Sequence, residues 1–123
     1  MDCKIELIFV PVTDVDRARD FYVDQVGFSL DHDIRFDENL RFVQVTPVGS
    51  ACSIAFGEGL GDAMAPGTQK GIQVVVESAE AARAELISRG VEATDLDVQP
   101  WGTFTTFDDP DGNHWAIQEL PAR

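Results

Sequence analysis

The sequence is poor in cysteine and in basic residues, and it contains no long hydrophobic run. Its 123 residues include two cysteines, Cys3 and Cys52, which form no CxxC pair. Without a disulfide framework the chain fits a reducing compartment, and we expect it in the cytoplasm. No apolar stretch approaches the length needed to cross a bilayer, and the first residues do not have the layout of a signal peptide.

Acidic residues outnumber basic ones by 22 to 9, which gives a net charge of −13. Such a surface repels phosphate backbones and anionic lipids, so we expect neither a nucleic-acid nor a membrane partner. The hydrophobic share of 44% and the charged share of 25% are ordinary for a soluble globular protein. The chain is long enough for one domain with its own core, and we interpret the acidic excess as a solubility feature.

Residues 105–119 show the clearest local pattern, two β-prone runs around an Asp-Pro-Asp-Gly turn. Pro110 sets φ for the first corner position, and Asp109 can bond back to the turn backbone. Gly112 or Asn113 can adopt a positive φ at little cost. This segment predicts a β-hairpin near the end of the chain.

The two halves of the chain repeat one pattern. A shift of 64 residues lays Ile8, Val10 and Val12 on Ile72, Val74 and Val76. Helices are expected over 14–24, capped by Thr13 or Asp14, and over 78–89, capped by Ser78. Strands are expected over 4–12, 28–36, 40–47, 51–57, 71–77, 92–98, 101–108 and 114–120.

Each half therefore has the order strand, helix and three strands. One such half cannot bury both faces of its strands, whereas two halves side by side can enclose a cleft. We predict a single α+β domain over residues 1–123, with modules at about 1–57 and 71–123. The glycine-rich segment 58–70 is the expected linker or lid.

Several of these motifs carry a resemblance to a known family. They are Val10 to Asp14, Ala18, Phe21-Tyr22, Val26 to Phe28, and Asp109 to Asn113. Together they resemble the vicinal oxygen chelate superfamily, the glyoxalase, bleomycin-resistance and extradiol-dioxygenase group. The resemblance spans the whole chain. It implies two βαβββ modules in a U-shaped half-barrel, commonly dimeric, with the ligand in the concave face.

The resemblance also implies a divalent metal, held by side chains at fixed positions. Three of these positions are occupied here by Leu7, Gly71 and Ala116, and the fourth lies in segment 51–57, which has no Asp, Glu or His. A divalent cation needs several His or carboxylate ligands that converge on one point. We therefore predict a site without a metal cofactor.

A different strand register keeps a divalent metal open as the alternative. Glu6 and Glu119 lie one to three residues from the expected positions, and a one-residue slip exchanges the faces of a strand. The same slip would turn Ile8, Val10 and Val12 away from the helix. Each side chain left exposed would cost about 1.5–3 kcal/mol, which favours the unslipped register.

The predicted cleft is apolar and aromatic, with a few amides and one imidazole. The residues assigned to the ligand site are Leu7, Phe9, Phe42, Phe56, Gln73, Trp101, Ala116 and Gln118. Such a lining suits a flat or hydrophobic organic molecule held by stacking and a few hydrogen bonds. His114 and Glu119 are the candidates for acid–base chemistry, although the sequence pairs neither with a nucleophile.

Three functions remain open at this point. The chain could be a metal-free binder of a small molecule, similar to the drug-sequestering members of the family. It could be an enzyme, a lyase, isomerase or dioxygenase that uses a metal at other residues or acid–base chemistry at His114 or Glu119. It could also be a non-catalytic subunit that uses the fold to dimerise. In each case we expect a homodimer.

Overall fold

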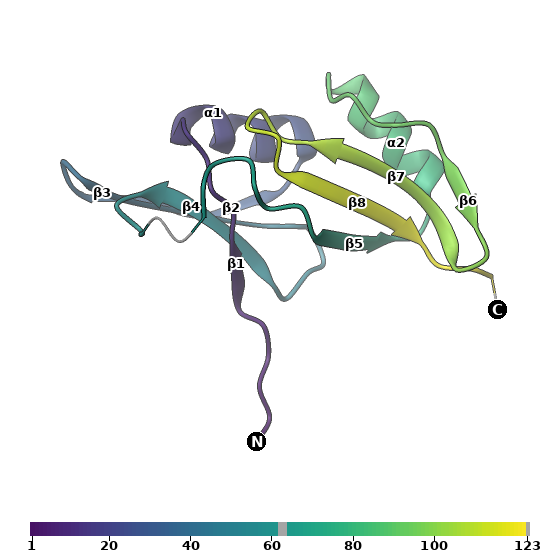
Figure 1. Ribbon diagram of the computed structural model, residues 1–123, viewed down its shortest axis with the longest axis horizontal. Helices are drawn as coiled ribbons and strands as arrows, with labels where there is room; N and C mark the ends of the chain where they lie inside the picture. Colours follow the sequence, from purple (N-terminus) through teal and green to yellow (C-terminus); the bar gives the residue numbers. More distant parts are fainter. Residues whose placement is uncertain (62–63, 123) are drawn as a thin grey trace.

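The computed structural model describes residues 1–61 and 64–122, in which eight strands form two four-stranded sheets (Figure 1). The first half contains β1 (Leu7–Phe9), α1 (Val15–Asp20), the π-helix η1 (Phe21–Val26), β2 (Ser29–Asp37), β3 (Leu40–Thr46) and β4 (Ser53–Glu58). The second half contains β5 (Ile72–Val76), α2 (Ala79–Ser88), β6 (Asp97–Gln99), β7 (Gly102–Asp108) and β8 (His114–Glu119). The strand orders are β1-β4-β3-β2 and β5-β8-β7-β6, so the predicted pair of βαβββ modules is confirmed.

Both sheets follow the same plan. β1 lies parallel to β4, β5 lies parallel to β8, and the other neighbours are antiparallel. Ile8 pairs with Ile54 in the first sheet, and its repeat counterpart Ile72 pairs with Trp115 in the second. The internal repeat in the sequence is therefore a repeat of strand pairing.

The helices begin at the predicted capping residues. The Asp14 carboxylate accepts a hydrogen bond from the backbone N–H of Arg17 at 3.0 Å, and Ser78 Oγ accepts one from Ala81 at 3.1 Å. Each bond satisfies a backbone donor that the helix leaves free. The first helix is not uniform, because α1 continues into the π-helix η1, which ends at Gly27 with φ +90°.

Two predicted strands are much shorter in the structure. β1 has three residues instead of the expected 4–12. The Val10 N–H still donates to Ala55 O at 2.9 Å, but Pro11 has no N–H with which to continue the pairing. β6 also has three residues, because the polar segment before it makes only isolated bonds, such as Thr94 N to Thr106 O at 3.0 Å.

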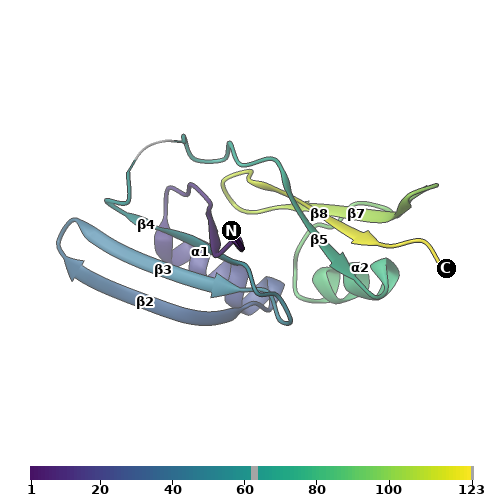
Figure 2. The same ribbon diagram turned by 90° about the horizontal axis from the view of Figure 1, so that it is seen from below.

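Each helix covers one face of its own sheet, so the opposite face stays open. In Figure 1, α1 and α2 both lie above the strands of their modules. α1 contacts β3 and β4, and α2 contacts β7 and β8. Figure 2 shows the segment after β4 crossing to β5 in the other module. Among the described residues, no helix is long and apolar enough to span a membrane.

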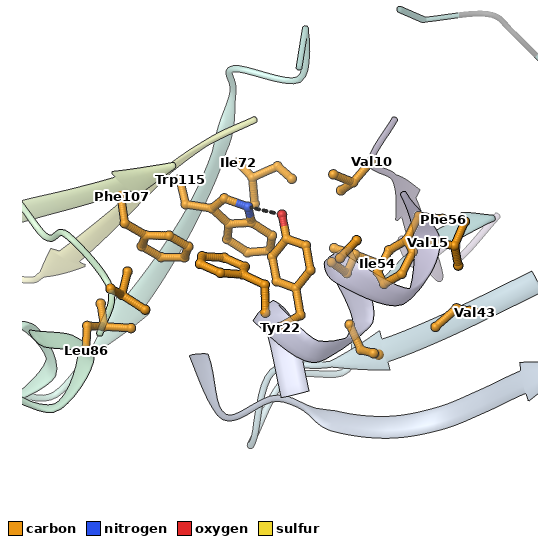
Figure 3. Packing of buried hydrophobic residues seen from close by; sticks show 14 of the residues in the cluster. Val10, Val15, Tyr22, Val43, Ile54, Phe56, Ile72, Leu86, Phe107 and Trp115 are labelled. Carbon is orange, nitrogen blue, oxygen red and sulfur yellow. Dashed lines mark hydrogen bonds between the residues drawn. The ribbon is translucent and has the colours of Figure 1, made fainter. Parts of the chain in front are cut away.

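The core joins the two modules around Tyr22 and Trp115 (Figure 3). Their rings are 5.6 Å apart between centroids, and Trp115 Nε1 donates a hydrogen bond to the Tyr22 hydroxyl at 3.0 Å. Phe56 packs on the other side of Tyr22, and Phe107 stacks on Trp115. Because these rings come from both modules, neither module has a complete core of its own.

The Asp-Pro-Asp-Gly turn is held by the buried carboxylate of Asp109. Its Oδ1 accepts the backbone N–H groups of Asp111 and Asn113, each at 2.9 Å, as the predicted turn requires. Its Oδ2 accepts the Tyr22 hydroxyl at 2.7 Å and Asn113 Nδ2 at 2.8 Å. Burial and the Asp109 charge raise the pKa of Tyr22, so the phenol remains a protonated donor. The turn thus fastens the second module to the first.

Candidate functional site

The open faces of the two sheets are the candidate site. Paired residues on neighbouring strands share a face, so the register defines both surfaces. The first open face comprises Leu7, Phe9, Ser29, His32, Ile34, Asp37, Leu40, Phe42, Gln44, Thr46, Ser53, Ala55 and Gly57. The second open face comprises Gln73, Val75, Asp97, Gln99, Gly102, Phe104, Thr106, Asp108, His114, Ala116 and Gln118.

Apolar side chains on these faces are unusually exposed. Phe9 on β1 is 49% exposed and Val75 on β5 is 59% exposed, whereas their neighbours Val10 and Ile72 are buried against the core. Large apolar side chains that lie on a sheet face without a covering layer favour contact with another molecule. The faces therefore offer hydrophobic contact area to a ligand or a partner.

The positions that the resemblance assigns to a metal do not fit one. Leu7 and Ala116 lie on the open faces, and Gly71 directly precedes β5. Ala55 pairs with Phe9 as Ala116 pairs with Gln73, which makes Ala55 the counterpart of Ala116 in the first module. None of these side chains has an oxygen, nitrogen or sulfur donor. Within the two described segments, no group of three His, Cys, Asp or Glu side chains is placed to hold a metal ion.

The alternative register is not adopted. The strand pairing keeps Ile8 and Val10 on the helix side and Leu7 on the open face. Glu119 lies on the helix side of the second sheet, where its Oε1 accepts the backbone N–H of Ala79 at 2.9 Å. This carboxylate caps the start of α2. Glu119, one of the two candidates for acid–base chemistry, is therefore absent from both open faces.

On the second open face, two amide side chains lie near Ala116, a position at which the resemblance implies a metal ligand. Gln73 Nε2 donates to Gln118 Oε1 at 2.8 Å, and Gln118 Nε2 donates to the backbone oxygen of Trp101 at 2.9 Å. Gln73 lies directly beside Ala116 in the register. The chain of bonds links β5, β8 and the β6–β7 turn, and it leaves amide groups at the surface to orient a bound molecule.

A cavity of about 450 Å³ lies at the end of β1, next to Phe9. It is lined by Phe9, Val10, Pro11, Val12, Phe56, Gly57, Leu60, Gly61, Met64 and Pro66. Every lining residue is apolar or glycine, so the cavity suits a hydrophobic group. Part of its wall comes from the expected linker 58–70, of which residues 62–63 lie outside the described residues.

His114 is paired with a carboxylate that the sequence reasoning did not identify. Its Nδ1 lies 2.6 Å from Asp108 Oδ1 across the hairpin, where the two residues are register partners. Both side chains border a second cavity of about 470 Å³ that also contains Thr94 and Thr106. The Asp-Pro-Asp-Gly turn fixes this register, so counting back across the turn from His114 could have found Asp108.

The remaining predicted residues divide between surface and core. Phe42 lies on the first open face opposite Ile34, and Trp101 is 61% exposed in the β6–β7 turn. Phe56 is only 2% exposed and packs against Tyr22, so it belongs to the core rather than to the open face. It reaches the candidate site only as part of the wall of the cavity beside Phe9.

Known proteins share this architecture along almost the whole chain. Residues 4–117 match the family described as the Glyoxalase/Bleomycin resistance protein/Dioxygenase superfamily. Among proteins with curated descriptions, none matches the chain.

Three solved structures resemble the chain at 33–35% sequence identity. TnmS3, an antibiotic-binding protein from Streptomyces sp. CB03234, is 33% identical over 98% of both chains, with a TM-score of 0.88. A glyoxalase/bleomycin resistance protein from the same Streptomyces strain is 35% identical over 94% of this chain and 99% of its own, with a TM-score of 0.82. A superfamily member from Sphaerobacter thermophilus DSM 20745 is 34% identical over 96% of this chain and 98% of its own, with a TM-score of 0.83.

The two βαβββ modules, the match over residues 4–117 and these similar structures agree with one another. The chain belongs to the glyoxalase/bleomycin resistance protein/dioxygenase superfamily.

Proposed function

We propose that this protein binds a small ring-bearing organic molecule, of the kind found among antibiotics, on its open faces and without a metal. The observation that carries the proposal is the residue set at the family's metal positions. Leu7, Gly71, Ala55 and Ala116 offer no ligating atom, and the exposed Phe9 is the register partner of Ala55. The similarity to TnmS3, an antibiotic-binding protein, supports the same conclusion.

The chemistry of the faces suits binding by stacking and a few hydrogen bonds. Phe9 and Phe42 offer ring surfaces, and the cavity beside Phe9 offers an enclosed apolar volume of about 450 Å³. Gln73 and Gln118 offer amide groups for orientation. A ligand pocket of this kind combines a mainly apolar lining with a few directed polar groups.

Titration with the neutral three-ring probe anthracenemethanol tests the proposal, followed by a panel of ring-bearing antibiotics. We expect saturable binding of anthracenemethanol, observed as a rise in its fluorescence anisotropy. Phe9→Ala should weaken it about tenfold, because a ring on the open face is lost. Ile87→Ala is the matched control, since Ile87 is 45% exposed on α2, on the helix side.

Equal binding by the wild-type chain and Phe9→Ala, or equal weakening by Ile87→Ala, would count against a site on the open faces. Failure of both the probe and the antibiotic panel to bind the wild-type chain would overturn the proposal itself.

We further propose that the protein forms a homodimer, in which the partner covers the part of the exposed apolar surface that a bound molecule leaves in water. Phe9 is the most exposed apolar side chain of β1, and Val75 is the most exposed apolar side chain of β5. Light scattering should give twice the mass of the 13.5 kDa chain. A monomeric mass at the concentration used for binding would contradict the dimer without affecting the ligand proposal.

One observation favours an enzyme as the second candidate function. The His114 and Asp108 side chains are 2.6 Å apart on the second open face, and a carboxylate so placed can orient an imidazole for proton transfer. A lyase or isomerase reaction would draw on this pair. Turnover by the wild-type chain that His114→Ala abolishes, with ligand binding retained, would establish this function in place of simple binding.

A further inference from the structure

We propose that the molecule bound on the open faces carries a positive charge, so that the site selects cationic over anionic ring-bearing ligands. The inference rests on the proposed function and adds the charge of the ligand to it. Its basis is the distribution of charged side chains between the two sides of the sheets.

Every described arginine lies on the helix side and is paired with a carboxylate. The pairs are Arg17–Asp111, Arg19–Asp33, Arg35–Glu58, Arg41–Asp33, Arg83–Asp95 and Arg89–Glu85. Four of these arginines belong to α1 and α2 or their ends. Arg41 reaches Asp16 of α1 at 2.8 Å, and Arg35 is its register partner. These guanidinium groups are already used in ion pairs, on the side away from the ligand.

On the open faces, the described residues include carboxylates that none of these arginines contacts. Among the described residues, Asp97 accepts a side-chain hydrogen bond only from Gln99 Nε2, at 2.9 Å, and Asp108 contacts His114. Asp31 contacts the hydroxyl of Thr46, a residue of the first open face. None of the described residues that define the two open faces is a lysine or an arginine.

Asp31 and Asp33 of β2 illustrate this difference between the two sides of the sheet. In β2, Asp33 points to the helix side and is held by Arg19 and Arg41. The Asp31 carboxylate instead reaches the open face, where it contacts none of the described arginines. Carboxylates that no arginine neutralises attract a cation bound on the open face and repel an anion bound there. The net charge of −13 adds to the same preference.

Three probes with the same ring system separate charge from ring binding. Anthracenemethanol is neutral, (aminomethyl)anthracene is a cation and anthracenecarboxylate is an anion, each substituted on the central ring. At about 20 mM ionic strength we expect the cation to bind about tenfold more tightly than the anion, with the neutral probe between them. At about 0.5 M salt the difference should fall to about twofold, because surface charges are then screened.

A pair of charge-neutralising variants locates the effect. Asp97→Asn on the second open face should weaken binding of the cation about threefold and leave the neutral probe unchanged. Glu80→Gln on α2 removes the same charge from the helix side and should change neither affinity. Asp97 and Glu80 are both exposed, so neither substitution disturbs the core.

The outcomes distinguish the two levels of the proposal. Binding of the neutral probe with no preference for the cation would overturn the charge inference and leave the proposed function intact. Equal loss in Asp97→Asn and Glu80→Gln would also overturn it, because the preference would then come from overall charge. Failure of all three probes to bind would remove the proposed function and this inference together.

Discussion

The Tyr22 hydroxyl joins the two modules through hydrogen bonds that no solvent reaches. It donates to Asp109 in the closing hairpin and accepts from Trp115 Nε1. Tyr22→Phe keeps the ring but leaves Trp115 Nε1 without an acceptor and removes one of the two hydrogen bonds to Asp109 Oδ2. An unsatisfied donor in the core costs about 1–3 kcal/mol. We expect the free energy of unfolding in urea to fall by that amount.

The same network predicts coupling between its members. Asp109→Asn replaces one acceptor oxygen with an NH2 group, so the side chain can no longer accept all four hydrogen bonds of the native carboxylate, one of which comes from Tyr22. The double variant with Tyr22→Phe should therefore lose less stability than the sum of the single losses, by about 0.5–3 kcal/mol. Additive losses would show that the two side chains act independently.

Asp33 should give the fold a stability contribution that depends on pH. Hydrogen bonds from Arg41, together with those from Arg19, lower the pKa of Asp33 to about 2. The carboxyl has a pKa of about 4 in an unfolded chain, so its contribution is complete above that pH and lost as pH falls towards about 2. Near neutral pH, Asp33→Asn should lower the free energy of unfolding by about 1 kcal/mol.

Urea unfolding from neutral pH to about pH 3 checks this, because the gap between wild type and Asp33→Asn should narrow across that range. Asp95→Asn is the control, since the Asp95 side chain is fully exposed. A gap that stays constant with pH would contradict the role given to Asp33.

Glu119 is a structural part of the second helix rather than a group on the site. Its carboxylate accepts the first backbone N–H of α2, where a negative charge is also favoured by the helix dipole. Glu119→Gln should cost about 0.5–1 kcal/mol of stability and leave binding of anthracenemethanol unchanged. If Glu119→Gln instead lost ligand binding while keeping full stability, Glu119 would have a direct role in the ligand site.

The sequence predicted the strands and helices well where a local signal exists. The caps at Asp14 and Ser78 and the turn at Asp109 have side chains that bond to their own backbone, so they can be recognised from neighbouring residues. The repeat could be found because equivalent strands bury the same face. These signals do not depend on the rest of the fold.

The faces of β4 could not be assigned in the same way. Residues Ser53 to Phe56 are all buried, so hydrophobicity does not alternate and gives no sign of which side each occupies. Phe56 was consequently assigned to the ligand site although it packs on Tyr22. The cavity wall formed by Leu60, Met64 and Pro66 was also missed, because a connecting segment has no periodicity from which to place it.

In the molecule as a whole, the helix side and the open side of the two sheets carry different kinds of side chain. The arginine ion pairs lie on the helix side, whereas the open faces carry the exposed Phe9 and Val75 and, among the described residues, carboxylates that no arginine contacts. The family match covers residues 4–117, and the positions that the resemblance assigns to a metal hold Leu7, Gly71 and Ala116.

The most direct measurement is a titration of chelator-treated protein with anthracenemethanol, repeated after addition of zinc, manganese or iron(II). The proposed site predicts one saturable transition with the same Kd in every sample, since no ligating side chain lies at Leu7, Gly71 or Ala116. Binding that appears only after a metal is added, together with one metal ion retained per chain, would contradict it.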